Sequence, residues 1–459
     1  MKKRLIAILM IALLACSSLV ACTVTPASNE PAKESEKEAE PEAEAEADEP
    51  EAEPEAAAEP EAEAGDDEIT SDPIEFTWLH HLQEEGKQAW VQYCVDRFTE
   101  EHPNVTINIE ILTADQYDTM VKTKAANGDA PMIFDASTTT FPEYVAAGYC
   151  ADVTDVSDYA DFPEDTLNQG VVDGKVYGVP LDVNAYCIFY NKDLFAELGL
   201  EVPTTNSELI AVCDKLVEAG VQPFSGGFAE QWCERIFVNN YADPATVMLN
   251  PKWYEEKMDG TSNFADDEAW KSAMETFASY KKYWGDDPFA VTWSDVQNDL
   301  ATGKAAMTMN GSWIISGVAS INPDFNMGAF PVPRTEDPAD NKMIIKPGNN
   351  FCVFNSDDEE LLKVAKAFFK FMCSKESAEF YAVSASGLTG AIVDVDAGPC
   401  INEINSYQGD AQYVQAGIVT LTSEYNSVYQ DIMAQQTNQD EIDVQAWAEA
   451  LDEGFAQIQ

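Results

Sequence analysis

Residues 173–195, DGKVYGVPLDVNAYCIFYNKDLF, form the stretch of sequence that decides the fold. The stretch joins a glycine-rich turn, a short apolar strand, an isolated acidic residue, Asp182, and a Tyr-Asn-Lys-Asp run. A catalytic loop, a β-hairpin in a core and the hinge of a ligand-binding cleft can each have this composition. The rest of the chain has to distinguish among these three interpretations.

The segments before this stretch alternate between strand and helix patterns. Strand patterns lie at 74–79, 105–112 and 131–137, and apolar residues follow helical spacing at 85–103 and 117–128. This β-α-β-α-β order predicts a parallel sheet with helices on both of its faces.

The alternation resumes after the stretch. Apolar periodicity predicts a helix at 206–220, strands at 303–313 and 351–355, and one long amphipathic helix at 357–382. Three tryptophans fall on helical periods beside other apolar residues and are assigned to the core: Trp90, Trp270 and Trp447. A chain of 459 residues exceeds what one hydrophobic core usually supports, so we expect two lobes.

The N-terminus predicts export. Three basic residues precede an apolar run that is too short to span a membrane, which is typical of a signal peptide at 1–21. Residues 19–22, LVAC, resemble the bacterial lipobox, which implies that Cys22 is lipidated and becomes the mature N-terminus. Residues 22–70 are rich in Glu, Ala and Pro and predict a disordered acidic tether. We therefore expect a lipid-anchored protein on the outer face of the cytoplasmic membrane, extracellular or periplasmic.

Composition disfavours several classes of partner and cofactor. The formal net charge of −56 disfavours nucleic acid and anionic lipid as partners. The chain has three histidines, two of them adjacent, and no C-x-x-C pair, so we expect no histidine- or cysteine-based metal site and no cofactor, while a structural calcium ion stays open. Eight cysteines follow Cys22, and both disulfides and buried free thiols stay open for them.

Four segments carry a family resemblance. DGKVYGVP at 173–180 and YNKDLF at 190–195 lie within the opening stretch, ANGDAPMIFDAS spans 126–137, and LATGKAAMTMNGSW spans 300–313. In their order along the chain, these segments resemble the family 1 extracellular solute-binding proteins of ABC importers, the group that includes maltose-binding protein. Met132 departs from the pattern, because that family usually has Asp there. The resemblance covers the chain from about residue 74 to its C-terminus.

The resemblance implies an α/β fold of the two-lobed, periplasmic-binding-protein type. Each lobe is expected to hold a mainly parallel sheet flanked by helices, and a hinge with multiple crossovers is expected to join the lobes. The implied boundaries are 71–182 plus about 350–392 for the N-terminal lobe and 183–349 plus about 393–459 for the C-terminal lobe. The opening stretch then holds the hinge and the floor of a cleft, which explains its mixed composition.

Candidate ligand contacts lie at the ends of strands, where ligand loops gather in an open α/β lobe. The resemblance implies that Trp313 stacks on the ligand and that the loop with Trp232 and Glu230 reaches the cleft. It places Asp182 and Asn184 at the hinge and the cleft floor. The ends of the first and third strands and the turn before the second crossover add Trp78, His80, Asp135, Ser137 and Asn349.

The sequence thus predicts a substrate-binding protein that performs no chemistry. It would capture a sugar or oligosaccharide as a monomer and deliver it to the permease of an ABC transporter, and its only membrane contact would be the lipid anchor. Two alternatives stay open. A secreted glycoside hydrolase would also use tryptophans and paired carboxylates, and a related binding protein would take a non-sugar solute such as a polyol.

Overall fold

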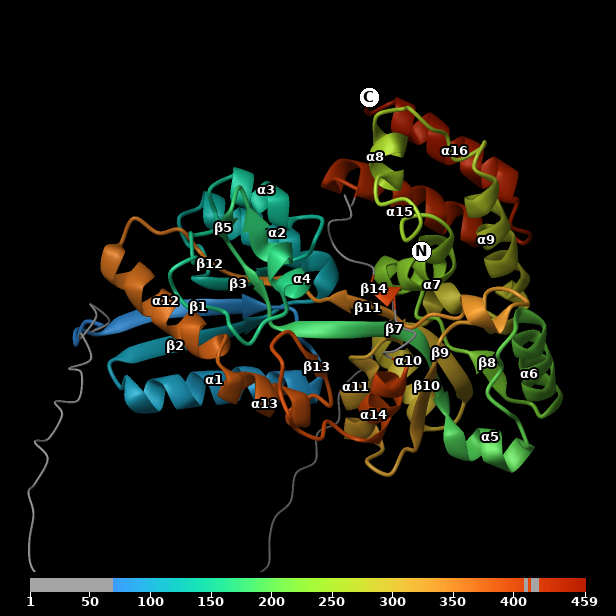
Figure 1. Cartoon of the computed structure of the whole chain (residues 1–459), viewed down its shortest axis with the longest axis horizontal. Coiled ribbons are helices and arrows are strands. Elements are labelled where there is room, and N and C mark those ends of the chain that lie inside the picture. The colour runs from blue at the N-terminus through green and yellow to red at the C-terminus, as the bar shows by residue number, and fades with distance from the viewer. Residues whose placement is uncertain (1–68, 408–411, 414–420) are drawn as a thin grey trace, which may run out of the picture. The chain divides into compact units, whose positions relative to one another are not determined.

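The computed structural model describes residues 69–407, 412–413 and 421–459, all within a compact unit that runs from Gly65 to Gln459 (Figure 1). The predicted signal peptide, Cys22 and nearly all of the predicted tether lie outside the described residues. Two sheets, each with its own helices, form the two lobes of this part of the chain. None of its helices is long and apolar enough to cross a membrane.

The first lobe is built on a five-stranded sheet in the order β2-β1-β3-β12-β6. Its strands are β1 (Ile74–His80), β2 (Val105–Ile111), β3 (Ile133–Ala136), β6 (Val179–Pro180) and β12 (Asn350–Val353). β1 runs parallel to β2 and β3, whereas β12 is antiparallel to β3 and β6. The predicted β-α-β-α-β start with its parallel strands is therefore confirmed.

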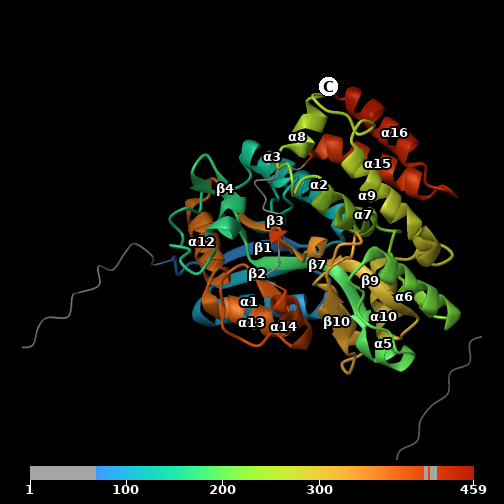
Figure 2. The same cartoon turned by 45° about the vertical axis from the view of Figure 1, so that its right-hand side comes forward.

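Helices cover both faces of the first sheet, as predicted (Figures 1 and 2). One face carries α1 (Glu85–Glu101), α12 (Glu359–Met372) and α13 (Lys375–Ser384), and the other carries α2 (Ala114–Ala126) and α3 (Phe141–Ala146). Successive residues of a strand point to opposite faces. Trp78 of β1 accordingly packs against Trp90 and Phe368, with ring centroids 5.6 and 5.5 Å apart, while Leu79 joins the core under α2.

The single long helix predicted at 357–382 is two helices in the structure. α12 ends at Met372, and α13 begins at Lys375 after a break at Ser374. The Ser374 hydroxyl accepts a hydrogen bond from the Ser377 backbone N–H and so caps the new helix. The apolar pattern could not reveal the break, because both helices pack against the same core.

The second lobe is built on a seven-stranded sheet with the path β14-β11-β7-β9-β8, and β10 and β13 also pair with β7. Its strands are β7 (Asp182–Asn191), β8 (Gln222–Phe224), β9 (Ala305–Gly311), β10 (Met327–Phe330), β11 (Ile344–Pro347), β13 (Leu388–Thr389) and β14 (Gln412–Tyr413). β7 is antiparallel to β9, β10, β11 and β13, whereas β8 is parallel to β9 and β14 is parallel to β11.

One strand in each sheet is reversed, β12 in the first and β7 in the second, and each comes directly after a strand of the other sheet along the chain. β7 follows β6 of the first sheet, and β12 follows β11 of the second. Such a strand starts at the junction between the lobes and runs outward, whereas the other strands end near that junction. All remaining strands of each sheet run in one direction, so the predicted mainly parallel sheets are confirmed with this one exception in each.

Helices of the second lobe bury its largest aromatic side chains. They include α6 (Asn206–Glu218), α7 (Gln231–Ala245), α9 (Glu268–Ser279), α10 (Trp293–Ala301), α11 (Ile314–Ile321), α15 (Ser423–Thr437) and α16 (Val444–Ala456). Trp270 and Trp447 are fully buried, with ring centroids 5.4 Å apart. Trp90 is buried in the first lobe, so the assignment of these three tryptophans to the core is confirmed.

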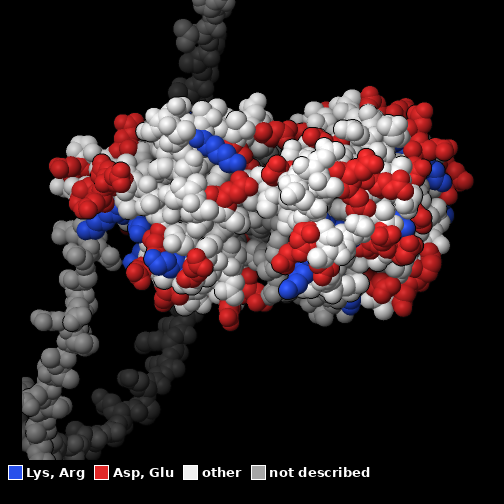
Figure 3. All heavy atoms as spheres, turned by 90° about the horizontal axis from the view of Figure 1, so that it is seen from above, with Lys and Arg blue, Asp and Glu red and all other residues white. Residues whose placement is uncertain are grey.

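The described part has an acidic surface and buried thiols. Figure 3 shows Asp and Glu side chains spread over the visible face with few Lys or Arg among them. All eight cysteines of this part are free and buried, which is one of the two states that the sequence left open. Burial raises the pKa of Cys94 to about 12, so this thiol stays protonated.

A buried carboxylic acid makes the stability of the second lobe depend on pH. Glu234 of α7 is fully buried; the Thr437 hydroxyl donates a hydrogen bond to its Oε1, and its Oε2 has no partner within the described residues. Burial raises the pKa of Glu234 from 4.5 to about 7, against smaller opposing effects of Thr437 and Lys281. The folded protein therefore holds a proton that the unfolded chain releases, and stability falls as the pH rises from about 4.5 to about 7.

Glu234→Gln is therefore expected to raise the free energy of unfolding near pH 8 by up to about 3 kcal/mol, because the amide never ionises. Near pH 4, where the acid is protonated in both states, variant and parent should be about equally stable. Urea denaturation at the two pH values measures both effects. Glu218→Gln, on the exposed side of α6, is the matched control and should change neither value. Equal stability of Glu234→Gln and parent near pH 8 would contradict this account.

Candidate functional site

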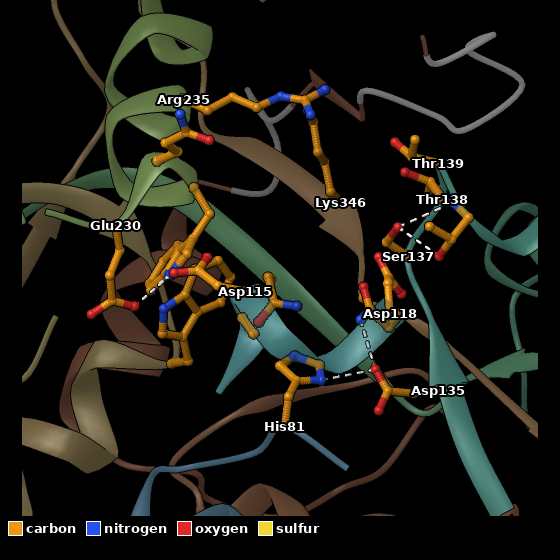
Figure 4. Close-up of a pocket in the computed structure, with 18 of the residues that line it drawn as sticks. His81, Asp115, Asp118, Asp135, Ser137, Thr138, Thr139, Glu230, Arg235 and Lys346 are labelled. Atoms are coloured by element: carbon orange, nitrogen blue, oxygen red, sulfur yellow. Dashed lines mark hydrogen bonds and ion pairs between the residues drawn. The ribbon is translucent and has the colours of Figure 1, made fainter. Parts of the chain in front are cut away.

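A cavity of about 810 Å³ lies between the two lobes and is lined by both of them (Figure 4). The first lobe contributes the residues after β1 and β3 and the sides of α1 and α2; the second contributes α7, β11 and the N-terminal ends of α10 and α15. Figure 4 shows Ser137, Thr138 and Thr139 on one side and Glu230 and Arg235 on the other. The described residues include no group of three or more His, Cys, Asp or Glu side chains suited to a metal ion.

The floor of the cleft lies where the chain crosses between the lobes. Asp182, the first residue of β7, accepts hydrogen bonds on Oδ2 from Tyr381 (3.0 Å), Asn184 (3.3 Å) and Lys87 (3.4 Å). Gly348, at the second crossover, donates its N–H to the Asp182 carbonyl (2.8 Å), and a Cβ on Gly348 would lie 1.8 Å from Asp182 Oδ1. Asp182 thus ties the crossovers to α1 and α13, and its Oδ2 is occupied by protein donors.

Three tryptophans and a tyrosine form an aromatic wall on the second-lobe side: Trp232, Trp293, Trp313 and Tyr186. The Trp313 ring centroid lies 6.0 Å from that of Trp232 and 5.6 Å from that of Tyr186. Trp232 in turn lies 5.2 Å from Trp293. Trp313 and Trp232 are half-buried and line the cavity, so each ring keeps an exposed part. Gly311 lies against Trp313, where a Cβ would come within 2.1 Å of the ring.

Glu230 holds the aromatic wall in place. Its Oε2 accepts a hydrogen bond from the Trp232 indole N–H (2.8 Å), and its Oε1 accepts one from the Trp293 backbone N–H (2.8 Å). The Trp293 indole N–H donates across the cleft to Glu84 Oε1 of the first lobe (3.2 Å). Both Glu230 oxygens are therefore occupied by protein donors, and the side chain orients the rings.

A buried acid and a histidine form part of the first-lobe wall. Asp135 Oδ2 accepts a hydrogen bond from the Asn349 amide (2.7 Å) and lies 3.0 Å from His81 Nδ1. The ring orientation makes the His81 contact an ion pair rather than an aligned hydrogen bond. Asp135 Oδ1 is buried without a hydrogen-bond partner among the described residues. Nearby, the hydroxyls of Ser137 and Thr140 lie 3.0 Å apart in a hydrogen bond.

The electrostatic interaction within this pair favours its charged form. Burial lowers the pKa of His81, but the Asp135 carboxylate more than offsets this effect and the pKa lies above 6.5. Burial raises the pKa of Asp135, but His81 and the hydrogen bond from Asn349 lower it by more, so it lies below 3.8. Each group therefore stabilises the charge of the other.

Two predicted contacts are wrong. Trp78 and His80 are fully buried in the first lobe, and neither lines the cavity. Trp78 packs under α1 and α12, and His80 Nδ1 accepts a hydrogen bond from the Leu82 backbone N–H (3.2 Å). The strand stays inside the lobe to its last residue, and His81, one residue later, is the first residue after β1 to reach the cleft.

The structure brings the other eight predicted residues together in the cleft lining: Trp313, Trp232, Asp182, Asn184, Asp135, Ser137, Glu230 and Asn349. The sequence analysis missed the polar side chains of α7 and β11. Arg235 donates a hydrogen bond to Asn426 Oδ1, and Lys346 Nζ lies 2.8 Å from Asp243 Oδ2. The Oδ1 atoms of Asn239 and Asp243 are buried without partners in the described part of the chain. This wall therefore offers acceptors as well as donors, and only the predicted loop with Trp232 and Glu230 pointed to it.

Comparison with known proteins identifies the family. The family model of the bacterial extracellular solute-binding proteins matches residues 94–403. The chain belongs to this family. A bacterial extracellular solute-binding protein binds its solute for transport and is not an enzyme, so the prediction of a binding protein is confirmed and the glycoside-hydrolase alternative is set aside.

Named relatives of this solute-binding protein match most of its length. The multiple sugar-binding protein of Streptococcus mutans is 25% identical over 318 residues, which cover 65% of this chain and 71% of that protein. The melibiose/raffinose/stachyose-binding protein MelE of Bacillus subtilis is 25% identical over 307 residues, 65% of this chain and 70% of that protein. A solved chitin oligosaccharide binding protein has a TM-score of 0.73 at 20% identity and covers 83% of this chain and 98% of its own. This likeness confirms the two-lobed α/β fold.

Proposed function

We propose that this solute-binding protein captures a sugar or oligosaccharide between its lobes and delivers it to the permease of an ABC transporter. The observation that carries the proposal is the partly exposed aromatic wall, with Trp313 between Trp232 and Tyr186, in a cavity of about 810 Å³. Sugar rings present apolar C–H faces and hydroxyl edges, which suit a cleft that combines aromatic rings with polar groups. The sugar-binding names of the relatives support the same ligand class.

The proposed contacts divide between the lobes. Trp313 and Trp232 stack on the apolar face of the ligand, and Asn184 and Ser137 exchange hydrogen bonds with its hydroxyl groups. Asp135 Oδ1 is buried, and this side chain positions its neighbours. Asn239 and Asp243 of the cavity lining have Oδ1 atoms without partners in the described part of the chain, and a ligand hydroxyl group would supply the donor that each needs. Asp182, Glu230 and Asn349 are bonded to protein groups and position the others.

Hinge closure is part of the proposal. The N-terminal lobe comprises 71–182 plus about 350–392, and the C-terminal lobe comprises 183–349 plus about 393–459. A ligand that touches both lobes favours their closed arrangement, which the permease then recognises. A signal peptide at 1–21 directs export and is removed, and the lipid on Cys22 and the acidic tether then hold the monomer on the outer face of the cytoplasmic membrane. Mass spectrometry of the N-terminal peptide checks the anchor, since an unmodified Cys22 would contradict it.

A thermal-shift panel tests the ligand class. The chain from residue 69 onward holds all described helices and strands and is screened against mono- and oligosaccharides, polyols and amino acids. A ligand at a hundred times its dissociation constant adds roughly 2.7 kcal/mol, which is a shift of a few degrees. We expect one class of sugar to raise the melting temperature. A shift with polyols alone would reassign the ligand, and no shift with any solute would contradict the proposal.

Gly311→Ala is expected to weaken sugar binding without touching the ligand. The added Cβ would lie 2.1 Å from the Trp313 ring, so the ring has to move. Holding the ring in its present position against this Cβ would cost about 1–3 kcal/mol. Calorimetric titration measures the loss. In the Trp313→Ala background the same glycine substitution should have no further effect, and equal losses in both backgrounds would show that Gly311 acts elsewhere.

A further inference from the structure

His81 lines the cleft but was not among the predicted ligand contacts, and it lies beside the fully buried carboxylate of Asp135. We infer that His81 contacts the ligand as a charged hydrogen-bond donor and that Asp135 positions it for that role; this inference rests on the proposed function. His81 lines the cavity with 27% of its side chain exposed, whereas the Asp135 side chain has no exposed surface. Figure 4 shows one ring nitrogen of His81 turned toward Asp135 and the other turned away from it.

Asp135 is fixed from several sides. Its Oδ2, which faces His81 Nδ1 at 3.0 Å, also accepts the Asn349 amide at 2.7 Å. Its backbone N–H donates to the Tyr117 hydroxyl at 2.8 Å, and that hydroxyl donates to the Leu79 carbonyl at 2.9 Å. The Tyr117 ring also lies edge-on to the His81 ring, with centroids 5.3 Å apart. The carboxylate cannot turn away, so it holds the imidazole with Nδ1 toward itself and leaves Nε2 for another partner.

The titratable groups that face His81 influence its pKa. By element they are Asp135 at the end of β3, Asp118 and Tyr117 on α2, Glu84 and Lys87 at the start of α1, and His80 on β1. Burial and Lys87 lower the pKa of His81, but Asp135 and Glu84 raise it by more, so it lies above 6.5. Burial lowers the pKa of the neighbouring His80 to about 4, so that ring stays neutral. Of these two rings, only His81 lines the cavity, and only the pKa of His81 is raised.

A charged imidazole changes what the cleft can recognise. Its Nε2–H is a strong donor to a hydroxyl, ether or carbonyl oxygen of a ligand. The donor is present below the pKa of His81 and is lost as the pH rises through that value, so ligand affinity should fall toward alkaline pH. The loss of one charge-assisted hydrogen bond corresponds to roughly tenfold weaker binding.

Calorimetric titration of the full chain across about pH 6 to 9 tests the inference, with raffinose as the first probe and then the tightest sugar of the panel. We expect affinity to fall roughly tenfold across this range. His81→Gln keeps a neutral donor and should give weaker binding that no longer depends on pH. Asp135→Asn should move the loss of affinity to lower pH, because the carboxylate no longer stabilises the imidazolium. His102→Gln, at the end of α1 outside the cavity lining, is the matched control and should keep the parent profile.

The outcomes separate the inference from the proposed function. A sugar that binds equally well across the range, or a His81→Gln variant with the parent profile, would overturn the role of His81 and leave the proposed function intact. No binding by any sugar at any pH would overturn the proposed function itself. NMR of the imidazole nitrogens of the unaltered chain, which has three histidines, gives a second readout. The His81 signals should titrate above the ordinary value and shift when sugar is added, and unmoved signals would contradict the contact.

Discussion

Replacing Trp313 by alanine is expected to weaken oligosaccharide binding by roughly 30- to 1,000-fold, which is about 2–4 kcal/mol. Trp313 contacts both Trp232 and Tyr186 within the aromatic wall, and Lys87 Nζ lies 5.8 Å from its ring centroid. Its removal takes away the surface on which a sugar ring would stack and leaves a gap that water fills. Calorimetric titration of parent and variant measures the two dissociation constants.

Two further variants test whether the loss of affinity arises in the cleft. Trp313→Phe keeps a smaller ring and should fall between parent and alanine variant. Trp270→Phe changes a fully buried ring of the second lobe, so it should lower stability and leave the affinity unchanged. If Trp313→Ala bound sugar as tightly as the parent, the ligand would not stack on the aromatic wall.

Replacing Asp182 by alanine is expected to lower the free energy of unfolding by about 3–5 kcal/mol. The carboxylate neutralises Lys87, which is buried, and also accepts the Tyr381 hydroxyl and the Asn184 amide. Without Asp182 the ammonium group stays buried without its counter-charge, and two further donors lose their acceptor. Urea denaturation, followed by circular dichroism, measures the change in stability.

The double variant Asp182→Ala with Lys87→Met is the control for this explanation. It removes the buried ammonium group together with its partner, so it should recover part of the lost stability. A double variant that is less stable than either single variant would show that the pair is not coupled. An Asp182→Ala variant as stable as the parent would show that the crossovers do not depend on this carboxylate.

The fold was largely predictable because its signals are local and periodic. Apolar spacing predicts the β-α-β-α-β start. The YGVP and YNKDLF segments predict that residues 173–195 cross from one lobe into the next. The reversal of β7 and β12 was not predicted, because strand direction depends on where the chain crosses between lobes. The break at Ser374 was also missed, because a capping serine inside an apolar pattern is a small local signal.

The candidate site was predictable where a motif fixed the position of a residue and not where burial had to be judged. Trp313 ends a recognisable segment, and the structure places it in the cavity lining. Trp78 and His80 were predicted to contact ligand because they lie near the end of a strand, but β1 stays buried through His80. The sequence around Trp293 did not indicate that this residue lines the cleft, because its position depends on hydrogen bonds to Glu230 and Glu84, which come from distant parts of the chain.

The central claim is that the solute is captured between two lobes that close on it. Small-angle X-ray scattering of the chain from residue 69 onward, with and without a saturating sugar from the panel, tests this claim most directly. The account predicts that sugar lowers the radius of gyration of the parent protein. The radius of Trp313→Ala should stay unchanged at a sugar concentration that saturates the parent but is too low to occupy this variant. A sugar that binds by calorimetry and leaves the radius of gyration of the parent protein unchanged would contradict it.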